Sequence, residues 1–127
     1  MRLLLLDKSA YVHGPLEVDD DYELCLCAVT RLELLYSARS ARDYELLEDD
    51  LSQFRDLLLD TATFAAALGA QRELAALGHH RVSIPDLLIA ACAHQHGADV
   101  AHVDRHFDVL ERVLVFHAVR AGGSAGT

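Results

Sequence analysis

The chain has 127 residues, of which 52% are hydrophobic and 24% are charged, and its formal net charge is −9 at pH 7. This length and composition predict one globular domain whose core needs no disulfide or metal to hold it together. The negative charge argues against a general nucleic-acid binder, because such proteins neutralise phosphates with Lys and Arg; a bound metal cation would still reverse the sign locally.

The chain begins with a strand signal. Residues 2–7 (RLLLLD) are apolar without alternation up to an aspartate, which predicts a strand covered on both faces, as in a parallel sheet. Ser9 offers an N-cap for a short helix over residues 10–13, which Gly14 and Pro15 end. Residues 23–29 (ELCLCAV) predict the second strand.

Two helix signals follow that strand. Thr30 and Glu33 have capping-box spacing, and Ser40 and Asp43 repeat it, so we expect a helix to start at each pair. Residues 55–60 (RDLLLD) predict a weaker third strand.

The second half continues the alternation of helices and strands. An Ala-rich helix is predicted over residues 61–77, ended by Gly78, and another over residues 84–96, with Pro85 in its first turn and Gly97 just after its end. The remaining segments predict a fourth strand, a short helix, a fifth strand and a flexible tail, over residues 99–104, 106–113, 114–119 and 121–127 respectively. The pattern predicts an α/β fold, a parallel sheet with helices on both faces, in a single domain over residues 1–120.

The cysteines and the amino-terminal segment indicate a cellular compartment. Cys25 and Cys27 alternate with leucines and are expected on one buried face, Cys92 lies in an apolar helix, and no C-x-x-C occurs. We therefore expect a reduced, cytoplasmic protein. Its first apolar run is too short for a signal peptide or a membrane span, so no membrane partner is expected.

Four carboxylates are predicted at one edge of the sheet. Asp7 ends the first strand and Asp104 the fourth, and ligands of open parallel sheets bind beyond the carboxyl ends of strands where strand order reverses. Glu33 lies one turn into the helix after the second strand, and Asp86 heads the very apolar helix that leads to the fourth. Crowded acids repel one another, and a divalent cation with oxygen ligands, Mg²⁺ or Mn²⁺, removes that conflict.

Each of these acids also has a structural interpretation. Glu33 fits a capping box with Thr30 and Asp86 fits one with Ser83, and both would be favoured near a helix amino terminus. Asp7 and Asp104 would begin turns after their strands. Residue types alone leave both interpretations open.

The segments LLLLDKSA, TRLELLYSARS, SIPDLLIAACA and VAHVDRHFDVL together resemble the PIN-domain ribonucleases, above all the toxins of VapBC-type toxin–antitoxin pairs. The resemblance implies a three-layer α/β/α sandwich with about five parallel strands. It implies a Mg²⁺- or Mn²⁺-dependent endoribonuclease in which Asp7, Glu33, Asp86 and Asp104 bind metal, and the metal activates a water that attacks an RNA phosphodiester. It also implies a small antitoxin as partner and a homodimer, for which we expect residues 30–54 to supply the surface.

Other residues near the site are assigned by the same resemblance and by charge. Ser9 matches a small hydroxyl residue of the family and is expected to bind a ligand or Asp7. Lys8 stands where the family often has a small residue, and we expect it to point away from Asp7 towards RNA phosphate. His106 stands where the family commonly has a further acid, so it is a metal ligand, a proton shuttle or a helix cap. Arg39, Arg42 and Arg81, in or near the loops expected around the site, are the other candidates for phosphate contact. The alternative is that they are solvated surface residues paired with nearby Asp and Glu.

Other chemistries fit less well. The eight histidines show no H-E-x-x-H or Cys/His spacing for zinc, and His94 and His96 are expected to be exposed at a helix end. No G-x-S-x-G elbow or phosphate-binding glycine loop occurs. Because of His106, the alternative to the enzyme is a degenerate PIN domain that binds RNA or a protein without cutting.

Overall fold

The computed structural model describes residues 1–13, 21–79, 81–103 and 107–120, and its centre is a five-stranded parallel sheet. The strands stand in the order β3-β2-β1-β4-β5, with bounds β1 Arg2–Leu6, β2 Tyr22–Leu26, β3 Arg55–Asp56, β4 Asp99–His102 and β5 Ala118–Arg120. β1 pairs in parallel with both β2 and β4. Strand order therefore reverses between β1 and β4, where the sequence placed the ends of its two aspartate-terminated strands.

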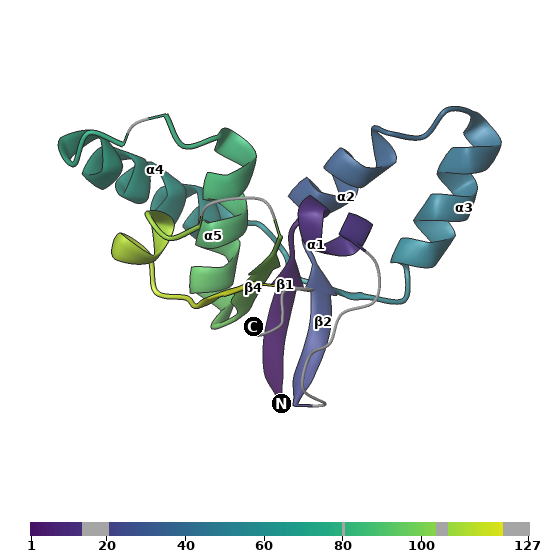
Figure 1. Ribbon diagram of the computed structural model, residues 1–127, viewed down its shortest axis with the longest axis horizontal. Coiled ribbons are helices and arrows are strands. Elements are labelled where there is room, and N and C mark those ends of the chain that lie inside the picture. The colour runs from purple at the N-terminus through teal and green to yellow at the C-terminus, as the bar shows by residue number, and fades with distance from the viewer. Residues whose placement is uncertain (14–20, 80, 104–106, 121–127) are drawn as a thin grey trace.

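Helices cover both faces of this sheet (Figure 1). They are α1 Lys8–His13, α2 Ala28–Leu35, α3 Ala41–Leu51, α4 Thr61–Ala76 and α5 Ile84–His96, with a 3-10 turn, η1, at Leu110–Arg112. Figure 1 shows α4 and α5 on one side of the strands and α1, α2 and α3 on the other. The predicted three-layer α/β/α sandwich with a parallel five-stranded sheet is confirmed.

The position of β1 between two hydrophobic clusters explains why its sequence is apolar without alternation. Leu5 belongs to the hydrophobic cluster under α4 and α5, whereas Leu4 and Leu6 belong to the cluster under α1, α2 and α3. Successive side chains of a strand point to opposite faces, so a strand covered on both faces needs an apolar residue at every position.

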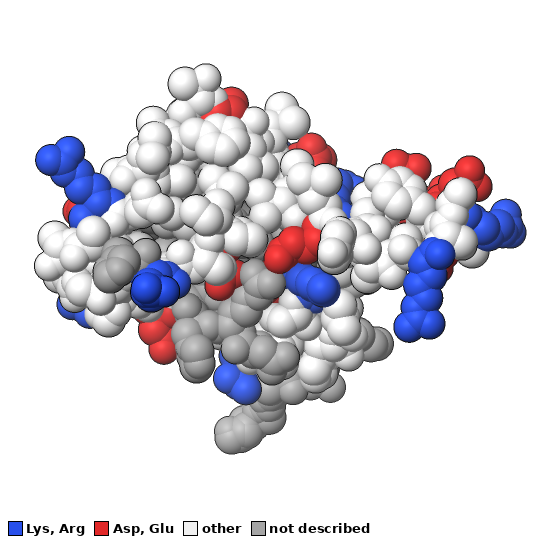
Figure 2. Space-filling view, turned by 90° about the horizontal axis from the view of Figure 1, so that it is seen from above, with Lys and Arg blue, Asp and Glu red and all other residues white. Residues whose placement is uncertain are grey.

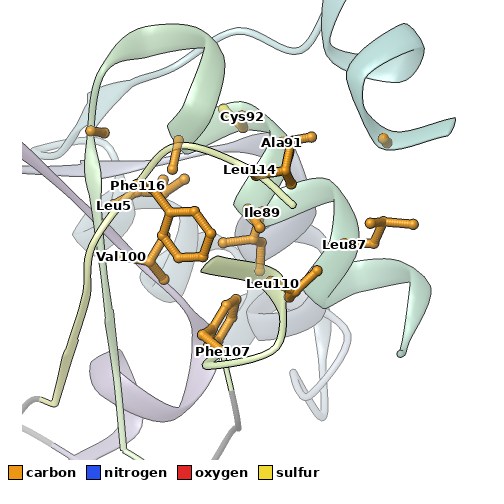
Figure 3. Packing of buried hydrophobic residues seen from close by; sticks show 14 of the residues in the cluster. Leu5, Leu87, Ile89, Ala91, Cys92, Val100, Phe107, Leu110, Leu114 and Phe116 are labelled. Carbon is orange, nitrogen blue, oxygen red and sulfur yellow. The ribbon is translucent and has the colours of Figure 1, made fainter. Parts of the chain in front are cut away.

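The larger hydrophobic cluster is built around α5 (Figure 3). Ile89 and the four residues that follow it to Ala93 are fully buried, so this helix has no solvated side along that stretch, as its composition predicts. Figure 3 shows Phe107, Leu110 and Phe116 packed near Ile89 and Val100. All three cysteines are free and buried in the same cluster, as expected from the sequence. None of the described helices is long and apolar enough to cross a membrane.

The weaker elements differ from their predictions. β2 ends at Leu26 and α2 begins at Ala28, two residues before the predicted start at Thr30. β3 has two residues, since the chain leaves the sheet after Leu57 donates a backbone hydrogen bond to Leu26. β5 starts at Ala118 instead of residue 114, and the described part of the short helix expected before it is η1. The predicted tail, residues 121–127, lies outside the described residues.

Candidate metal and active site

Asp7 lies at the carboxyl end of the central strand and is fully buried. Its Oδ1 accepts a hydrogen bond from the backbone N–H of Ala10 at 3.0 Å, which caps α1, and its own N–H donates to the Ala101 carbonyl on β4. Asp7, and not Ser9 as the sequence suggested, is therefore the side chain that begins this helix. A buried carboxylate held on one oxygen in this way has a defined orientation at the switch point of the sheet.

Ser9 connects Asp7 to the neighbouring strand. Its Oγ donates to Asp7 Oδ1 at 2.6 Å and accepts a hydrogen bond from the backbone N–H of Val103 at 2.9 Å. Val103 directly follows β4 and directly precedes Asp104 in the chain. The expectation that Ser9 hydrogen-bonds Asp7 is confirmed, and the same hydroxyl joins the ends of β1 and β4.

Thr30 does not form the predicted capping box with Glu33. The N-cap of α2 is Cys27, whose side chain makes no capping hydrogen bond, and Thr30 lies inside the helix and is fully buried. Its hydroxyl donates to the Leu6 carbonyl at 2.9 Å. Thr30 therefore ties α2 to the residue before Asp7, and the capping explanation of Glu33, one turn further along, is wrong.

Asp86 occupies the position that the capping interpretation gave it. Ser83 is the N-cap of α5, and its Oγ accepts a hydrogen bond from the Asp86 backbone N–H at 3.3 Å. The Asp86 residue is half-buried, as expected from the apolar helix that it heads. α5 packs against α2, the helix that carries Glu33. A helix-terminal role and a ligand role are both compatible with this position.

The donor set suits a hard cation, but the described residues do not complete a site. All four candidate ligands are carboxylates, which Mg²⁺ and Mn²⁺ prefer. Two of their oxygen atoms, Asp7 Oδ2 and Glu33 Oε1, are buried. Among the residues that the structure describes, no group of three or more His, Cys, Asp or Glu side chains is arranged to hold a metal. Asp104 and His106 lie outside the described residues, so the four-carboxylate site stays a prediction.

Lys8 and Glu33 share an open pocket. This pocket, with a volume of about 380 Å³, is lined by Lys8, Leu32, Glu33 and Tyr36. The expectation that Lys8 points away from Asp7 assumed that Lys8 continues β1, where successive side chains alternate. Lys8 instead begins α1, so this alternation does not apply to it. The carboxyl edge of the sheet is seen from above in Figure 2, where acidic and basic side chains stand next to one another near the middle of the face.

The three arginines proposed for phosphate contact are all exposed. Arg39 and Arg42 lie at the start of the α3 segment, where the Arg39 backbone N–H donates to Asp43 Oδ2, and Arg81 precedes α5. Ser40 caps α3 by accepting from the Asp43 N–H, as its spacing predicts. The three arginine side chains are therefore accessible to a ligand, but their positions alone do not show which ligand they bind.

The histidines and cysteines have structural partners. His94 Nδ1 accepts a hydrogen bond from the Val115 N–H, and His96 Nε2 lies 2.8 Å from the Leu58 carbonyl; His94 is exposed as expected, whereas His96 is half-buried. The neighbouring Cys27 thiol, together with burial, raises the pKa of Cys92, while the Cys92 thiol lowers the pKa of Cys27 to about 7. Burial also raises the pKa of Cys25. These fully buried thiols are core residues and not accessible nucleophiles.

Sequence reasoning missed two features of this region. The Arg31 guanidinium joins three segments, since it donates to Asp56 Oδ1 and to the carbonyls of Leu51 and Phe54. Beside Glu33, the side chains of Leu32 and Tyr36 are 68% and 90% exposed. Apolar residues at i and i+4 of a helix signal a shared stripe, but not which side of the helix the sheet covers.

The family model described as PIN domain matches residues 6–113. The ribonuclease VapC17 of Mycobacterium tuberculosis is 38% identical over 117 residues, which cover 84% of this chain and 86% of that protein. The ribonuclease VapC18 of the same species is 44% identical over 89 residues, which cover 68% of this chain and 65% of that protein.

Solved structures agree on the fold. A crystal structure of VapBC-5, a member of the VapBC family of toxin–antitoxin systems from Mycobacterium tuberculosis, aligns with a TM-score of 0.76 at 23% identity. The alignment covers 94% of this chain and 99% of that chain. At this identity the likeness concerns the arrangement of the strands and helices.

Proposed function

The chain belongs to the PIN-domain family, and within it to the VapC ribonucleases, and we propose that it is a metal-dependent endoribonuclease that acts as the toxin of a toxin–antitoxin pair. The observation that carries this proposal is Asp7, a fully buried carboxylate at the switch point of the sheet, held by Ser9 and by the amino terminus of α1. Asp7 also caps α1, but ligands of open parallel sheets bind at this switch point, so a buried carboxylate here suits a metal ligand.

The proposed metal is Mg²⁺ or Mn²⁺, held by Asp7, Glu33, Asp86 and Asp104. When bound, such an ion supplies a water of lowered pKa and a positive charge next to a phosphoryl oxygen. Ser9 keeps the Asp7 carboxylate in one orientation and ties it to the end of β4. Lys8, together with Arg39, Arg42 and Arg81, would contact the phosphates of the RNA strand, which a chain of net charge −9 otherwise repels.

The test of the enzyme is cleavage of total RNA by the pure protein with and without Mn²⁺. We expect Mn²⁺-dependent cleavage that is lost in Asp7→Asn. Asp49→Asn is the matched control, because it makes the same change on the exposed surface of α3 and should leave cleavage intact. Equal cleavage by the wild type and Asp7→Asn would reject the proposal.

A separate test measures metal binding without activity. Mn²⁺ should raise the melting temperature of the wild type, because the carboxylates form a site only in the folded chain. We expect Asp86→Asn to stabilise the metal-free protein by relieving repulsion between carboxylates, and to reduce the effect of Mn²⁺. If the metal-free melting temperature of this variant falls instead, Asp86 acts mainly as an anion at the start of α5.

The antitoxin is proposed to be a small protein with a basic segment. An Arg or Lys of that segment would replace the charge of the metal among the carboxylates, and the net charge of −9 favours such a partner. A short gene just upstream that encodes a DNA-binding protein would identify the antitoxin, and its co-expression with this chain should yield a complex without ribonuclease activity. The free, reduced cysteines are consistent with the cytoplasmic location that we propose for both proteins.

We also infer a homodimer, for which a second surface is available besides the one expected from residues 30–54. A groove of about 260 Å³ between α4 and α5 is lined by Phe64, Leu68, Ile84 and Leu88 together with Ala67, Gln71 and Leu87. Residues 61–71, in the α4 half of this groove, include no charged side chain. Two copies of an acidic chain repel each other least where the contact is uncharged. A shift to monomer in Leu68→Asp, measured by light scattering, is the expected result.

The second candidate is a degenerate PIN domain that binds RNA or a protein without cutting it. His106, where the family commonly has a further acid, favours this alternative. Binding of RNA without cleavage, unchanged by Mn²⁺, would support it over the enzyme.

A further inference from the structure

An exposed aromatic ring stands beside the candidate site. Tyr36 is 90% exposed, the highest value among the tyrosines and phenylalanines that the structure describes. It is the C-cap residue of α2, and its backbone, not its ring, makes the cap hydrogen bonds. The fold therefore gives this ring no packing role.

Tyr36 does not stand alone. Leu32 lies one turn earlier on the same helix and is 68% exposed, and both side chains line the 380 Å³ pocket that also holds Glu33 and Lys8. Residues at i and i+4 lie side by side on a helix surface. An apolar strip therefore stands beside a candidate metal ligand and a positively charged ammonium group, in a pocket that is open to solvent.

This combination suits one nucleotide of an unpaired RNA strand. Aromatic side chains bind unpaired bases by stacking, and every base offers a flat face for this contact, whereas the bases of a duplex are already stacked inside it. Lys8 supplies the cation for the phosphate of the same or the next nucleotide. Glu33 is one of the proposed metal ligands, so a nucleotide in this pocket would have its phosphate near the proposed metal.

We propose that Leu32 and Tyr36 form a stacking site for one unpaired base of the RNA, next to the position at which the strand is cut. This inference rests on the proposed ribonuclease function and adds to it a residue that selects unpaired over paired RNA. A second protein is the competing occupant of an apolar strip. We favour RNA because the strip continues directly into the pocket of Lys8 and Glu33, whereas the described groove between α4 and α5 is the more apolar surface.

The test compares binding to single-stranded and duplex RNA. All proteins carry Asp7→Asn so that no strand is cut, and Mn²⁺ is present throughout. The probe is a short fluorescent oligoadenylate, alone or annealed to oligouridylate, and binding is followed by anisotropy. We expect Tyr36→Ala to weaken binding of the single strand by about tenfold, which is the size of one base–aromatic stack, and to leave binding of the duplex unchanged. Tyr36→Phe should bind the single strand like the parent, because it keeps the ring.

The matched control is Tyr44→Ala, which removes a partly exposed tyrosine from α3, outside this pocket. It should bind both probes like the parent. Binding of the single strand also gives a direct signal, because the protein contains no Trp and stacking on Tyr36 should quench part of its tyrosine fluorescence.

Each other outcome overturns the inference in an identifiable way. Unchanged binding of the single strand by Tyr36→Ala rejects the stacking site but leaves the ribonuclease intact. A change in oligomeric state with unchanged RNA binding shows that the strip is covered by a second copy. If the parent binds neither probe and the wild type cuts no RNA, the proposed function itself fails.

Discussion

The two faces of the sheet are held together very differently. On one face α5 is buried along most of its length, and α4 contributes Ala67, Ala70 and Leu74 to the same cluster. On the other face α2 contributes Leu34 and α3 contributes Leu51 to a smaller cluster, and most of α3 is exposed. One face is thus a packed core, and the other consists of helices attached at a few points.

The candidate site lies between these two faces. Asp86 is on α5 and belongs to the packed face, Glu33 is on α2 and belongs to the lightly packed face, and Asp7 ends the strand shared by both. The distance between Glu33 and Asp7 is therefore controlled less by burial than by individual hydrogen bonds. The bond from Thr30 to the Leu6 carbonyl and the contacts of Arg31 are the clearest of these.

The largest expected effect tests the packing difference directly. Ile89→Ala on α5 should lower the free energy of unfolding by about 4 kcal/mol, because the rigid surroundings cannot close the cavity. Leu51→Ala should cost less, about 2 kcal/mol, because α3 is free to shift towards the gap. Both are measured by urea denaturation of the metal-free protein. Equal losses would mean that α3 is packed as firmly as α5.

The next effect concerns the tie between α2 and β1. Thr30→Val keeps the shape of the side chain but removes the donor to the Leu6 carbonyl, and should lower the free energy of unfolding by about 2 kcal/mol. Because this bond positions α2 relative to Asp7, the rise in melting temperature caused by Mn²⁺ should also shrink. Thr30→Ser should restore both properties, since it restores the hydroxyl. A full response to Mn²⁺ in Thr30→Val would limit Thr30 to stability.

Much of this architecture could be predicted from the sequence, for identifiable physical reasons. A run of leucines without alternation requires cover on both faces, and the aspartate at its end marks the strand terminus. α5 was equally clear, with Ser83 before it, Pro85 in its first turn and Gly97 in the left-handed conformation after it. In each case several local signals agree on one structure.

The sequence predictions are wrong where contacts between distant segments determine where a helix or strand begins or ends. The spacing of Thr30 and Glu33 fits a capping box. Because β2 ends at Leu26, however, α2 begins early enough that Thr30 lies inside the helix, where its side chain contacts β1. The apolar run over residues 57–59 predicts a longer β3, but of this segment only Arg55 and Asp56 pair with β2. An edge strand is held by one neighbour, so composition says little about where its pairing stops.

A smaller effect is expected when the similar N-caps of α3 and α5, one on each face of the sheet, are removed. Ser40 caps α3 and Ser83 caps α5, each by accepting a hydrogen bond from the N–H of an aspartate three residues later, at 3.0 and 3.3 Å. Replacement by Ala should cost about 1 kcal/mol in either case. Only Ser83→Ala should also reduce the Mn²⁺-dependent rise in melting temperature, because Asp86 lies in the first turn of its helix. An equal reduction in Ser40→Ala would show that α3 is coupled to the metal site.

The smallest effect depends on one charge at the start of α4. Asp60 Oδ1 accepts hydrogen bonds from Gln95 on α5 and from the N–H groups of Ala62 and Thr63, and the bond from Gln95 contributes most to lowering the pKa of this carboxyl. A pKa that is lower in the folded than in the unfolded chain stabilises the fold above the unfolded pKa, and this contribution disappears as the pH falls through the folded pKa. Asp60→Asn keeps a capping side chain without the charge, so it should melt slightly below the wild type at pH 7. The difference in melting temperature should vanish on acidification below pH 3.8, the ordinary pKa of the group. A difference that stays constant over this range would mean that Gln95 joins α4 to α5 through geometry alone, and that the packed face owes nothing to the charge of Asp60.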